Sequence, residues 1–229
     1  MLNNEIHEKY MEDILTAIFT DEIGKYLAFK GGTLAYRKHY LDRFSTDIDL
    51  DILDSDKEQL IIQGMREILV RFGDIKNETL GKTIHRWMFR YDEKSMNIKI
   101  ELNKRIWKQN TYHKQKIKGI SISCMTPDCI FANKLVAFSE RFANRDLYDV
   151  YFFFTKKFPI KESLIVERKG LPAKKFIQNL MKELSSHFTG NRILAGLGEV
   201  LTDKQKVRVK KSLLDEVIKL LKKYNASIK

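Results

Sequence analysis

The fold is decided by two neighbouring stretches, Lys30-Gly31-Gly32-Thr33 and Arg43-Phe44-Ser45-Thr46-Asp47-Ile48-Asp49-Leu50. From Asp47 to Ile52, acidic and apolar residues alternate one by one. Because successive side chains of a β-strand point to opposite sides, this alternation predicts a strand with one apolar face and one acidic face. The two glycines predict a turn into a helix, where bare backbone N–H groups can approach phosphate oxygens.

Asp47 and Asp49 are candidate ligands of a divalent metal ion. Two carboxylates side by side repel each other unless a cation, either a metal ion or a nearby lysine, neutralises them. Mg²⁺ is typically bound by one or two carboxylates together with substrate phosphates. A glycine turn or an Asp-x-Asp strand alone would be ordinary, but both features in one strand–helix–strand unit indicate phosphoryl or nucleotidyl transfer.

The composition is that of a globular protein. The chain has 229 residues, which is enough for one large domain or two small ones, and 43% of them are hydrophobic, which is enough for an ordinary core. No apolar run is long enough to cross a bilayer, and the N-terminus does not resemble a signal peptide. Cys124 and Cys129 form no disulfide or zinc pattern and are expected to be free thiols. We therefore expect a cytoplasmic protein with no membrane partner.

The formal net charge of +12 favours a polyanionic partner, with nucleic acid first, although a basic surface can also serve solubility alone. The charge is concentrated between Asn103 and Gly119, which contains no acid and has aromatic residues among its cations. Such a mixture can grip phosphates and stack on unpaired bases. The predicted RNA-binding residues are Lys104, Arg105, Trp107, Lys108, Tyr112 and Lys114. A second basic stretch runs from Lys204 to Lys229.

The first half of the chain predicts a mixed α/β sheet of about four or five strands with flanking helices. Periodicity predicts helices over residues 5–26 and 33–41, and a third from an N-cap at Asp56 to about residue 72. The predicted strands cover residues 26–29, 46–53, 82–91, 96–102 and 117–124, the last of them at an edge of the sheet.

The second half predicts helices only. Thr126 is expected to cap a helix whose first residue is Pro127. Helical patterns then cover residues 130–141, 145–154, 172–187 and 203–225. The change of pattern predicts a domain boundary near residue 125, with a sheet-containing domain over residues 1–125 and an all-helical domain over residues 126–229.

These motifs resemble those of the AbiEii/AbiGii nucleotidyltransferase toxins. The resemblance is carried by the two opening stretches, by Lys134-Leu135-Val136-Ala137-Phe138, and by Arg145-Asp146-Leu147-Tyr148-Asp149-Val150-Tyr151, and it spans about residues 28–152. It implies a nucleotidyltransferase domain like that of DNA polymerase β, followed by a helical domain that contributes a lysine and an acid to the active site. Members of this family are toxins of bacterial toxin–antitoxin or phage-defence systems, and characterised relatives add nucleotides to tRNA 3′ ends.

The resemblance also implies roles for single residues. Gly31, Gly32 and Thr33 would cradle the β- and γ-phosphates of a nucleoside triphosphate, and Lys134 would offset the triphosphate charge. The last acid of the family pattern is either Asp146 or Asp149. We favour Asp149, which would orient Lys134 or contact the nucleotide, so that Asp146 would pair with an arginine.

The expected reaction is attack of a hydroxyl group on the α-phosphate, with pyrophosphate leaving. Asp47 and Asp49 would hold one or two Mg²⁺ ions. Glu101, on the polar face of a neighbouring strand, is either a third catalytic carboxylate or a surface residue. Arg43 and Ser45 flank the acidic strand and are predicted to contact the triphosphate, although Arg43 could equally form a salt bridge with Asp42 or Asp47. The histidines His39, His85 and His113 receive no catalytic role.

The sequence therefore predicts a Mg²⁺-dependent nucleotidyltransferase toxin that modifies RNA, with the tRNA 3′ end as the expected acceptor, and that inhibits translation. A toxin implies a cognate antitoxin as a partner. Two alternatives stay open. One is a nucleotidyltransferase that modifies a protein or a small molecule, and the other is a catalytically inert relative that binds nucleic acid.

Overall fold

A computed structural model describes residues 4–93, 97–188, 191–197 and 200–228. They form two compact units. The sheet unit contains residues 1–40, 44–106 and 111–126, and the helical unit contains residues 127–229 together with two short segments, 41–43 and 107–110. Met96, which begins a predicted strand, and Lys229, which ends the second basic stretch, lie outside the described residues.

The described part of the sheet unit is built on a seven-stranded mixed sheet with the order β3-β4-β5-β2-β1-β7-β6. The central strand β2 is antiparallel to β1 and parallel to β5, and β1 is parallel to β7. The remaining pairs are antiparallel. The strands are β1 Leu27–Lys30, β2 Asp47–Ile52, β3 Asp74–Leu80, β4 Ile84–Arg90, β5 Ile98–Asn103, β6 Tyr112–Ile117 and β7 Ile120–Met125.

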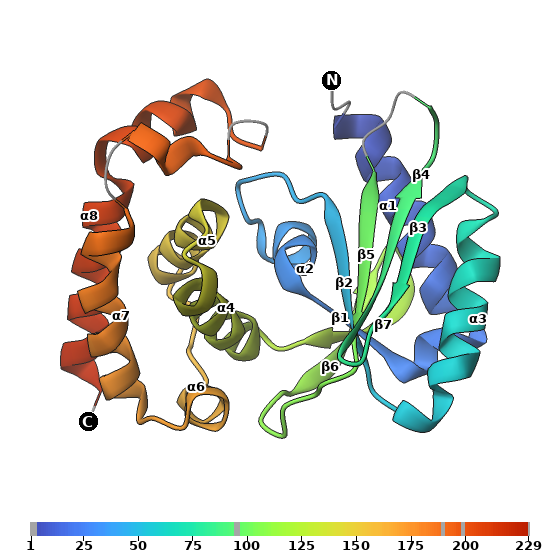
Figure 1. The fold of residues 1–229 in the computed structure, drawn as a ribbon, viewed down its shortest axis with the longest axis horizontal. Helices are drawn as coiled ribbons and strands as arrows, with labels where there is room; N and C mark the ends of the chain where they lie inside the picture. The colour runs from blue at the N-terminus through green and yellow to red at the C-terminus, as the bar shows by residue number, and fades with distance from the viewer. Residues whose placement is uncertain (1–3, 94–96, 189–190, 198–199, 229) are drawn as a thin grey trace. The chain divides into compact units, whose positions relative to one another are not determined.

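Helices cover both faces of this sheet (Figure 1). The helix α2 (Gly31–His39) packs against β1 and β2 on one face, and α1 (Asn4–Thr20) and α3 (Glu58–Leu69) pack together on the other. Two short 3-10 helices, η1 (Glu22–Tyr26) and η2 (Ser55–Lys57), complete the unit. The apolar side chains of β2 are removed from water, with Ile48 and Leu50 fully buried, because both faces of a central strand are covered.

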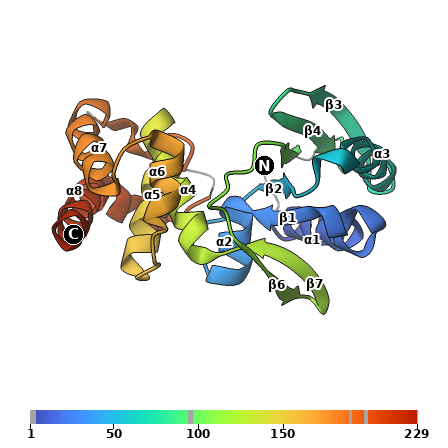
Figure 2. The same cartoon turned by 90° about the horizontal axis from the view of Figure 1, so that it is seen from below.

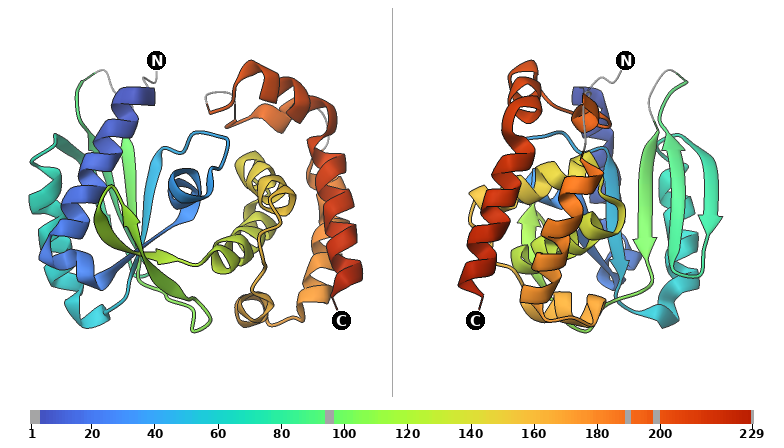
Figure 3. Two further views of the ribbon diagram at one scale, coloured as in Figure 1. Left: turned by 180° about the vertical axis from the view of Figure 1, so that it is seen from behind. Right: turned by 60° about the vertical axis from the view of Figure 1, so that its left-hand side comes forward.

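The helical unit consists of α4 (Pro127–Arg141), α5 (Asn144–Thr155), α6 (Glu162–Lys169), α7 (Ala173–His187), η3 (Asn191–Leu194) and α8 (Asp203–Ser227). The helix α5 packs on both α4 and α8, and α7 packs along α8 (Figure 3). A capping box formed by Thr202 and Gln205 begins α8. From there its residues Val209, Leu213, Val217 and Leu221 are buried at the four-residue spacing of one helical face. None of the described helices is long and apolar enough to span a bilayer.

The predicted mixed sheet is confirmed, but the predicted number of four or five strands is wrong. The missed strands β3 and β6 lie at the two edges of the sheet, and most of their side chains are exposed or half-buried. Such strands need no apolar face and so carry no alternation that a sequence pattern can reveal. The helix α6 was also missed, because its eight residues are too few for a clear period.

Three local predictions are corrected. The strand predicted over residues 117–124 is two strands, because Lys118 (φ 50°) and Gly119 (φ 83°) turn the chain into the hairpin of β6 and β7 (Figure 2). The edge strand is consequently β6 and not β7. Asp54, not Asp56, caps the turn before α3, since its side chain accepts the Asp56 N–H. The opening helix ends at Thr20, and η1 follows as a separate 3-10 turn capped by Asp21.

Candidate active site

The candidate site lies on three adjacent strands of the sheet unit. In β2, Asp47 and Asp49 share one face because they are two residues apart. The register pairs Asp49 with Lys30 of β1 on one side and with Glu101 of β5 on the other. It likewise places Lys99 of β5 beside Asp47. The predicted position of Glu101 on a neighbouring strand is confirmed, and the sheet thus brings three carboxylates and two lysines together.

Asp49 is the acid whose charge is least well compensated. Burial raises its pKa to about 6, and the neighbouring charges of Asp47 and Glu101 act in the same direction against the opposing effect of Lys30 and Lys99. A carboxyl group with this pKa ionises more readily once an additional cation is bound beside it. The electrostatics of this position therefore match a site for a divalent cation.

Asp47 and Glu101 are bridged by Lys99, which lies two residues before Glu101 on β5 and therefore on the same strand face. The Lys99 ammonium lies 3.1 Å from Asp47 Oδ2 and 3.5 Å from Glu101 Oε1. Glu101 also accepts a hydrogen bond of 2.7 Å from Arg86 of β4. Burial alone would raise the pKa of Glu101, but Lys99 and Arg86 outweigh it and lower that pKa.

The third aspartate of the strand, Asp51, is neutralised by a lysine. It is fully buried, and its carboxylate accepts hydrogen bonds from Lys30 at 2.5 Å and from the Tyr112 hydroxyl at 2.8 Å. Tyr112 was predicted to bind RNA. Its hydroxyl group is used within the sheet unit, so only the face of its half-buried ring is left for such a contact.

The glycine turn lies directly against the aspartate pair. Gly31 begins α2 with φ 77°, in the left-handed region that favours glycine. A Cβ atom at Gly31 would lie 2.2 Å from Asp49 Oδ2, so no other residue fits without moving that carboxylate. Thr33 is buried, and its hydroxyl contacts the Asp47 carbonyl oxygen and lies 2.9 Å from the Ser45 hydroxyl. Those two hydroxyl groups thus fasten α2 to the start of β2.

The residues of the site fit a hard divalent cation. Among the described residues, no group of three or more His, Cys, Asp and Glu side chains is arranged to hold a metal ion. Mg²⁺ does not need such a group, because one or two carboxylates suffice when substrate phosphates supply further oxygens. Asp47 and Asp49 provide that pair, and the close approach of Gly31 to Asp49 keeps side chains away from one side of it.

The helical unit contains a network of two buried acids and three cations. Arg43 binds Asp149 through two hydrogen bonds of 2.6 and 2.7 Å. Lys134 lies 2.9 Å from Asp149 and 2.8 Å from Asp146. Asp146 also accepts a hydrogen bond of 2.5 Å from Arg141. The side chains of Asp146 and Asp149 are completely shielded from solvent or nearly so.

This network shows which partners several predicted site residues have. Arg43 pairs with Asp149, which is 106 residues away in the sequence, so no local pattern reveals this contact. Asp146 does pair with an arginine, Arg141, as predicted, and Asp149 does contact Lys134. Burial alone would raise the pKa of each acid, but the cations outweigh it, lowering the pKa of Asp149 and bringing that of Asp146 to about 2.

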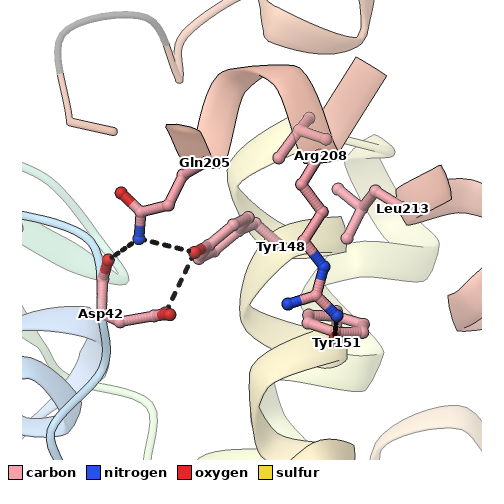
Figure 4. A pocket seen from close by; sticks show the side chains of 7 residues that line it. Asp42, Tyr148, Tyr151, Gln205, Arg208 and Leu213 are labelled. Carbon is pink, nitrogen blue, oxygen red and sulfur yellow. Dashed lines mark hydrogen bonds between the residues drawn. The ribbon is translucent and has the colours of Figure 1, made fainter. Parts of the chain in front are cut away.

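Asp42, which precedes Arg43, is hydrogen-bonded to side chains of α5 and α8. Tyr148 donates a hydrogen bond of 3.0 Å to the Asp42 carboxylate, and Gln205 donates to the Asp42 carbonyl oxygen at 2.5 Å and to the Tyr148 hydroxyl at 3.1 Å (Figure 4). Arg208 lies over the Tyr151 ring at 4.9 Å beside them. These side chains line a small pocket in the helical unit.

The predicted RNA-binding stretch is divided between the units. Lys104, Arg105, Tyr112 and Lys114 belong to the sheet unit, and Trp107 and Lys108 belong to the helical unit. Within the helical unit, Arg168 lies over the Trp107 ring at 5.6 Å, and the Lys108 N–H donates to Glu167. Lys104 pairs with Glu58 at 2.8 Å. The side chains of Arg105, Lys108 and Lys114 are exposed, and RNA binding by this stretch stays a prediction.

Known structures share this fold. The structure of JHP933 from Helicobacter pylori matches with a TM-score of 0.57 and 19% identity, covering 99% of this chain and 97% of that one. MenT4, the nucleotidyltransferase toxin Rv2826c from Mycobacterium tuberculosis H37Rv, matches with a TM-score of 0.54 and 14% identity, covering 100% of this chain and 91% of that one. A comparison with curated protein sequences gave no match. The fold is that of nucleotidyltransferases.

The family follows from the sequence itself. The profile described as "Nucleotidyl transferase AbiEii toxin, Type IV TA system" matches residues 13–206, most of the chain. This protein belongs to the AbiEii family of nucleotidyltransferase toxins. The resemblance predicted from the motifs is confirmed, and the protein is a transferase whose substrates are nucleoside triphosphates.

Replacing Gly31 should damage the site specifically. Gly31→Ala and Gly119→Ala both place a Cβ on a left-handed residue, at an expected cost of about 1–2 kcal/mol each. Only Gly31→Ala also forces a movement of Asp49, because a Cβ at Gly119 meets no atom within 4 Å. Calorimetric titration with Mn²⁺ should show weakened binding for Gly31→Ala and unchanged binding for Gly119→Ala. Equal affinities of the two variants for Mn²⁺ would show that Gly31 does not influence the metal site.

The metal-free protein should contain an aspartate that titrates at about pH 6, which is Asp49. Carboxyl ¹³C NMR can follow it, with Asp49→Asn identifying the signal. Because this pKa lies above the usual 3.8, ionisation of Asp49 removes stability as the pH rises through about 6. Added Mg²⁺ should lower the apparent pKa, and its affinity should fall about tenfold per pH unit below that value. Titration near pH 4 would refute the assignment.

The acids of the helical unit should have the opposite pH dependence. Since the pKa of Asp149 lies below its usual 3.8, its contribution to stability is present above that pH and is lost as the pH falls through its folded pKa. Asp149→Asn leaves Arg43 and Lys134 partly unpaired and should cost about 3–5 kcal/mol at pH 7. Urea unfolding at pH 7 and pH 3 measures this cost, which should shrink at pH 3. Asp203→Asn, at an exposed position, is the control and should change little.

Proposed function

We propose that the protein is a Mg²⁺-dependent nucleotidyltransferase toxin that transfers a nucleoside monophosphate from a nucleoside triphosphate to RNA, with the tRNA 3′ end as the acceptor. The observation that carries this proposal is the aspartate pair of β2, in which burial and neighbouring acids raise the pKa of Asp49 and which lies against the glycine turn of α2. Within a family of nucleotidyltransferases, that arrangement supports a metal-dependent site for a triphosphate.

In this proposal the residues of the sheet unit bind the metal ion and the triphosphate. Asp47 and Asp49 hold the Mg²⁺, which when bound supplies charge for the attacking and leaving oxygens. The backbone N–H groups at Gly31 and Gly32 bind the β- and γ-phosphates, since they are donors at the start of a helix. The hydroxyl groups of Thr33 and Ser45 position that helix relative to β2.

Glu101 is proposed to accept the proton of the attacking hydroxyl group. It lies beside Asp49 in the sheet register, and the pKa of Glu101 is lowered, so that it is ionised at neutral pH and can act as a base. Its contacts with Arg86 and Lys99 restrict its orientation.

Lys134 and Asp149 occupy the positions of the later family motifs. We propose that Lys134 offsets the charge of the triphosphate and that Asp149 orients it. Lys134 remains charged, because Asp149 and Asp146 raise its pKa against the effect of burial. Its ammonium group is bonded to those two acids, so contact with a phosphate requires an exchange of partners. Arg43 supports this pair through Asp149.

RNA is the proposed acceptor because of the excess positive charge and the exposed cations Arg105, Lys108 and Lys114. Modification of tRNA 3′ ends would stop translation, which is the proposed toxic effect in a toxin–antitoxin or phage-defence system. The family implies an antitoxin that restrains this activity. Nucleoside triphosphates and tRNA place the proposed reaction in the cytoplasm.

Incubation with each of the four α-labelled nucleoside triphosphates in turn, total RNA and Mg²⁺ tests the proposal. Label should appear on tRNA and be released by 3′-exonuclease. Asp49→Asn should lower the rate at least about a hundredfold, because it removes a proposed metal ligand. The control Asp203→Asn should retain the activity.

Other outcomes distinguish the alternatives. Label on protein alone, or on a small molecule alone, would contradict the RNA acceptor. If no label is transferred and expression of Asp49→Asn arrests growth as the parent does, the catalytic proposal is wrong and an inert nucleic-acid-binding relative replaces it.

A further inference from the structure

Lys99 is a cation held between two acids of the candidate site. Its ammonium group lies 3.1 Å from Asp47 Oδ2 and 3.5 Å from Glu101 Oε1, and no function assigned above uses it. Its side chain is 31% exposed, as is that of Asp47, so water reaches the pair. The contact is therefore not sealed into the core, and either partner can exchange it for another.

The same face contains a lysine–aspartate pair of a different kind. Lys30 binds Asp51 at 2.5 Å, but there the carboxylate is 1% exposed and is also bonded to Tyr112. Breaking that pair would leave a buried charge uncompensated, which is costly. The pair of Lys99 and Asp47 carries no such penalty, because both groups can be solvated when they separate.

The charges explain what Lys99 does in the absence of metal. Without it, Asp47, Asp49 and Glu101 would be three neighbouring carboxylates. The Lys99 ammonium lies 3.1 Å from Asp47 and 3.5 Å from Glu101, so one cation is held between two of these carboxylates. A charge at this position attracts the same oxygen of Asp47 that a divalent cation requires.

We propose that Lys99 is a built-in competitor of the metal ion: it occupies Asp47 in the metal-free protein, and binding of the divalent cation moves its ammonium group onto Glu101. This inference rests on the proposed function, because it assumes that Asp47 is a metal ligand. Lysine suits the role, since its ammonium is a point charge on a flexible four-carbon chain. Glu101 can receive it, as it already lies 3.5 Å away and is fixed by Arg86.

Binding of Mn²⁺ alone to the full-length protein, without nucleotide, tests the inference by electron paramagnetic resonance. Lys99→Met removes the charge and keeps the length of the side chain, so it should tighten Mn²⁺ binding about tenfold, because the cation no longer competes with an ammonium for Asp47. Lys99→Arg keeps the charge and should restore the parent affinity to within about threefold. If Lys99→Met does not fold, Lys99→Gln is measured in the same way.

Lys104→Met is the matched control. Lys104 is a similarly half-buried lysine of the sheet unit, but it pairs with Glu58 at 2.8 Å instead of with the site. Lys104→Met removes the same net charge as Lys99→Met and should leave the Mn²⁺ affinity within about twofold of that of the parent protein. An equal tightening in Lys104→Met would show a general charge effect and overturn the inference.

The remaining outcomes separate this inference from the proposed function. If the parent protein binds Mn²⁺ and Lys99→Met binds it equally or more weakly, the competitor role of Lys99 is wrong while the metal site stands. If Asp47→Asn and the parent protein both fail to bind Mn²⁺, the metal site itself is wrong and the role of Lys99 falls with it.

Discussion

The repulsion among the carboxylates of β2 is the constraint on which the candidate site depends. Alternation along one strand places Asp47, Asp49 and Asp51 on a single face, and like charges at that spacing destabilise a sheet unless cations compensate for them. The neighbouring strands supply the compensation unevenly. Lys30 binds Asp51 at 2.5 Å, and Lys99 lies between Asp47 and Glu101. Asp49, between them, is left with the raised pKa. The acid of β2 whose charge is least compensated is therefore Asp49, which also lies against the glycine turn.

The glycine turn at Gly31 and the carboxylate of Asp49 are in direct contact. The chain leaves β1 at Lys30 and enters α2 through Gly31, whose left-handed conformation lets the helix begin without a spacer. The helix start then lies beside Asp49 so closely that even a methyl group would collide with the carboxylate. Helix N–H donors, which favour anions, therefore stand next to acids that favour a cation. A triphosphate with a bound metal ion has both kinds of charge. Its phosphates would suit the N–H donors of α2, and its metal ion would suit the acids of β2.

The local elements of the candidate site were predicted from the sequence, whereas contacts between distant residues and the edge strands were missed for physical reasons. The alternation in β2 and the glycine turn are local patterns, so the strand, the helix and the placement of Asp47 and Asp49 on one strand face were predicted correctly. The register between strands is not local, so the bridge from Lys99 to Asp47 could not be found from spacing alone. Arg43 was predicted to contact the triphosphate or, equally, to pair with Asp42 or Asp47, and its bond to Asp149 was missed because that residue comes from a helix far along the sequence. The edge strands β3 and β6 escaped because exposed strands need no apolar side.

The acids of the two units differ in a way that indicates their roles. In the helical unit, the cations around Asp146 and Asp149 outweigh the effect of burial and lower both pKa values, as in a network that stabilises the fold. In the sheet unit, burial and neighbouring acids raise the pKa of Asp49, which costs stability unless a ligand is bound. A fold retains such a cost where function requires it. By this reasoning we propose that Asp49 binds the ligand and that Asp149 acts through the residues it contacts, Arg43 and Lys134, more than by touching a nucleotide itself.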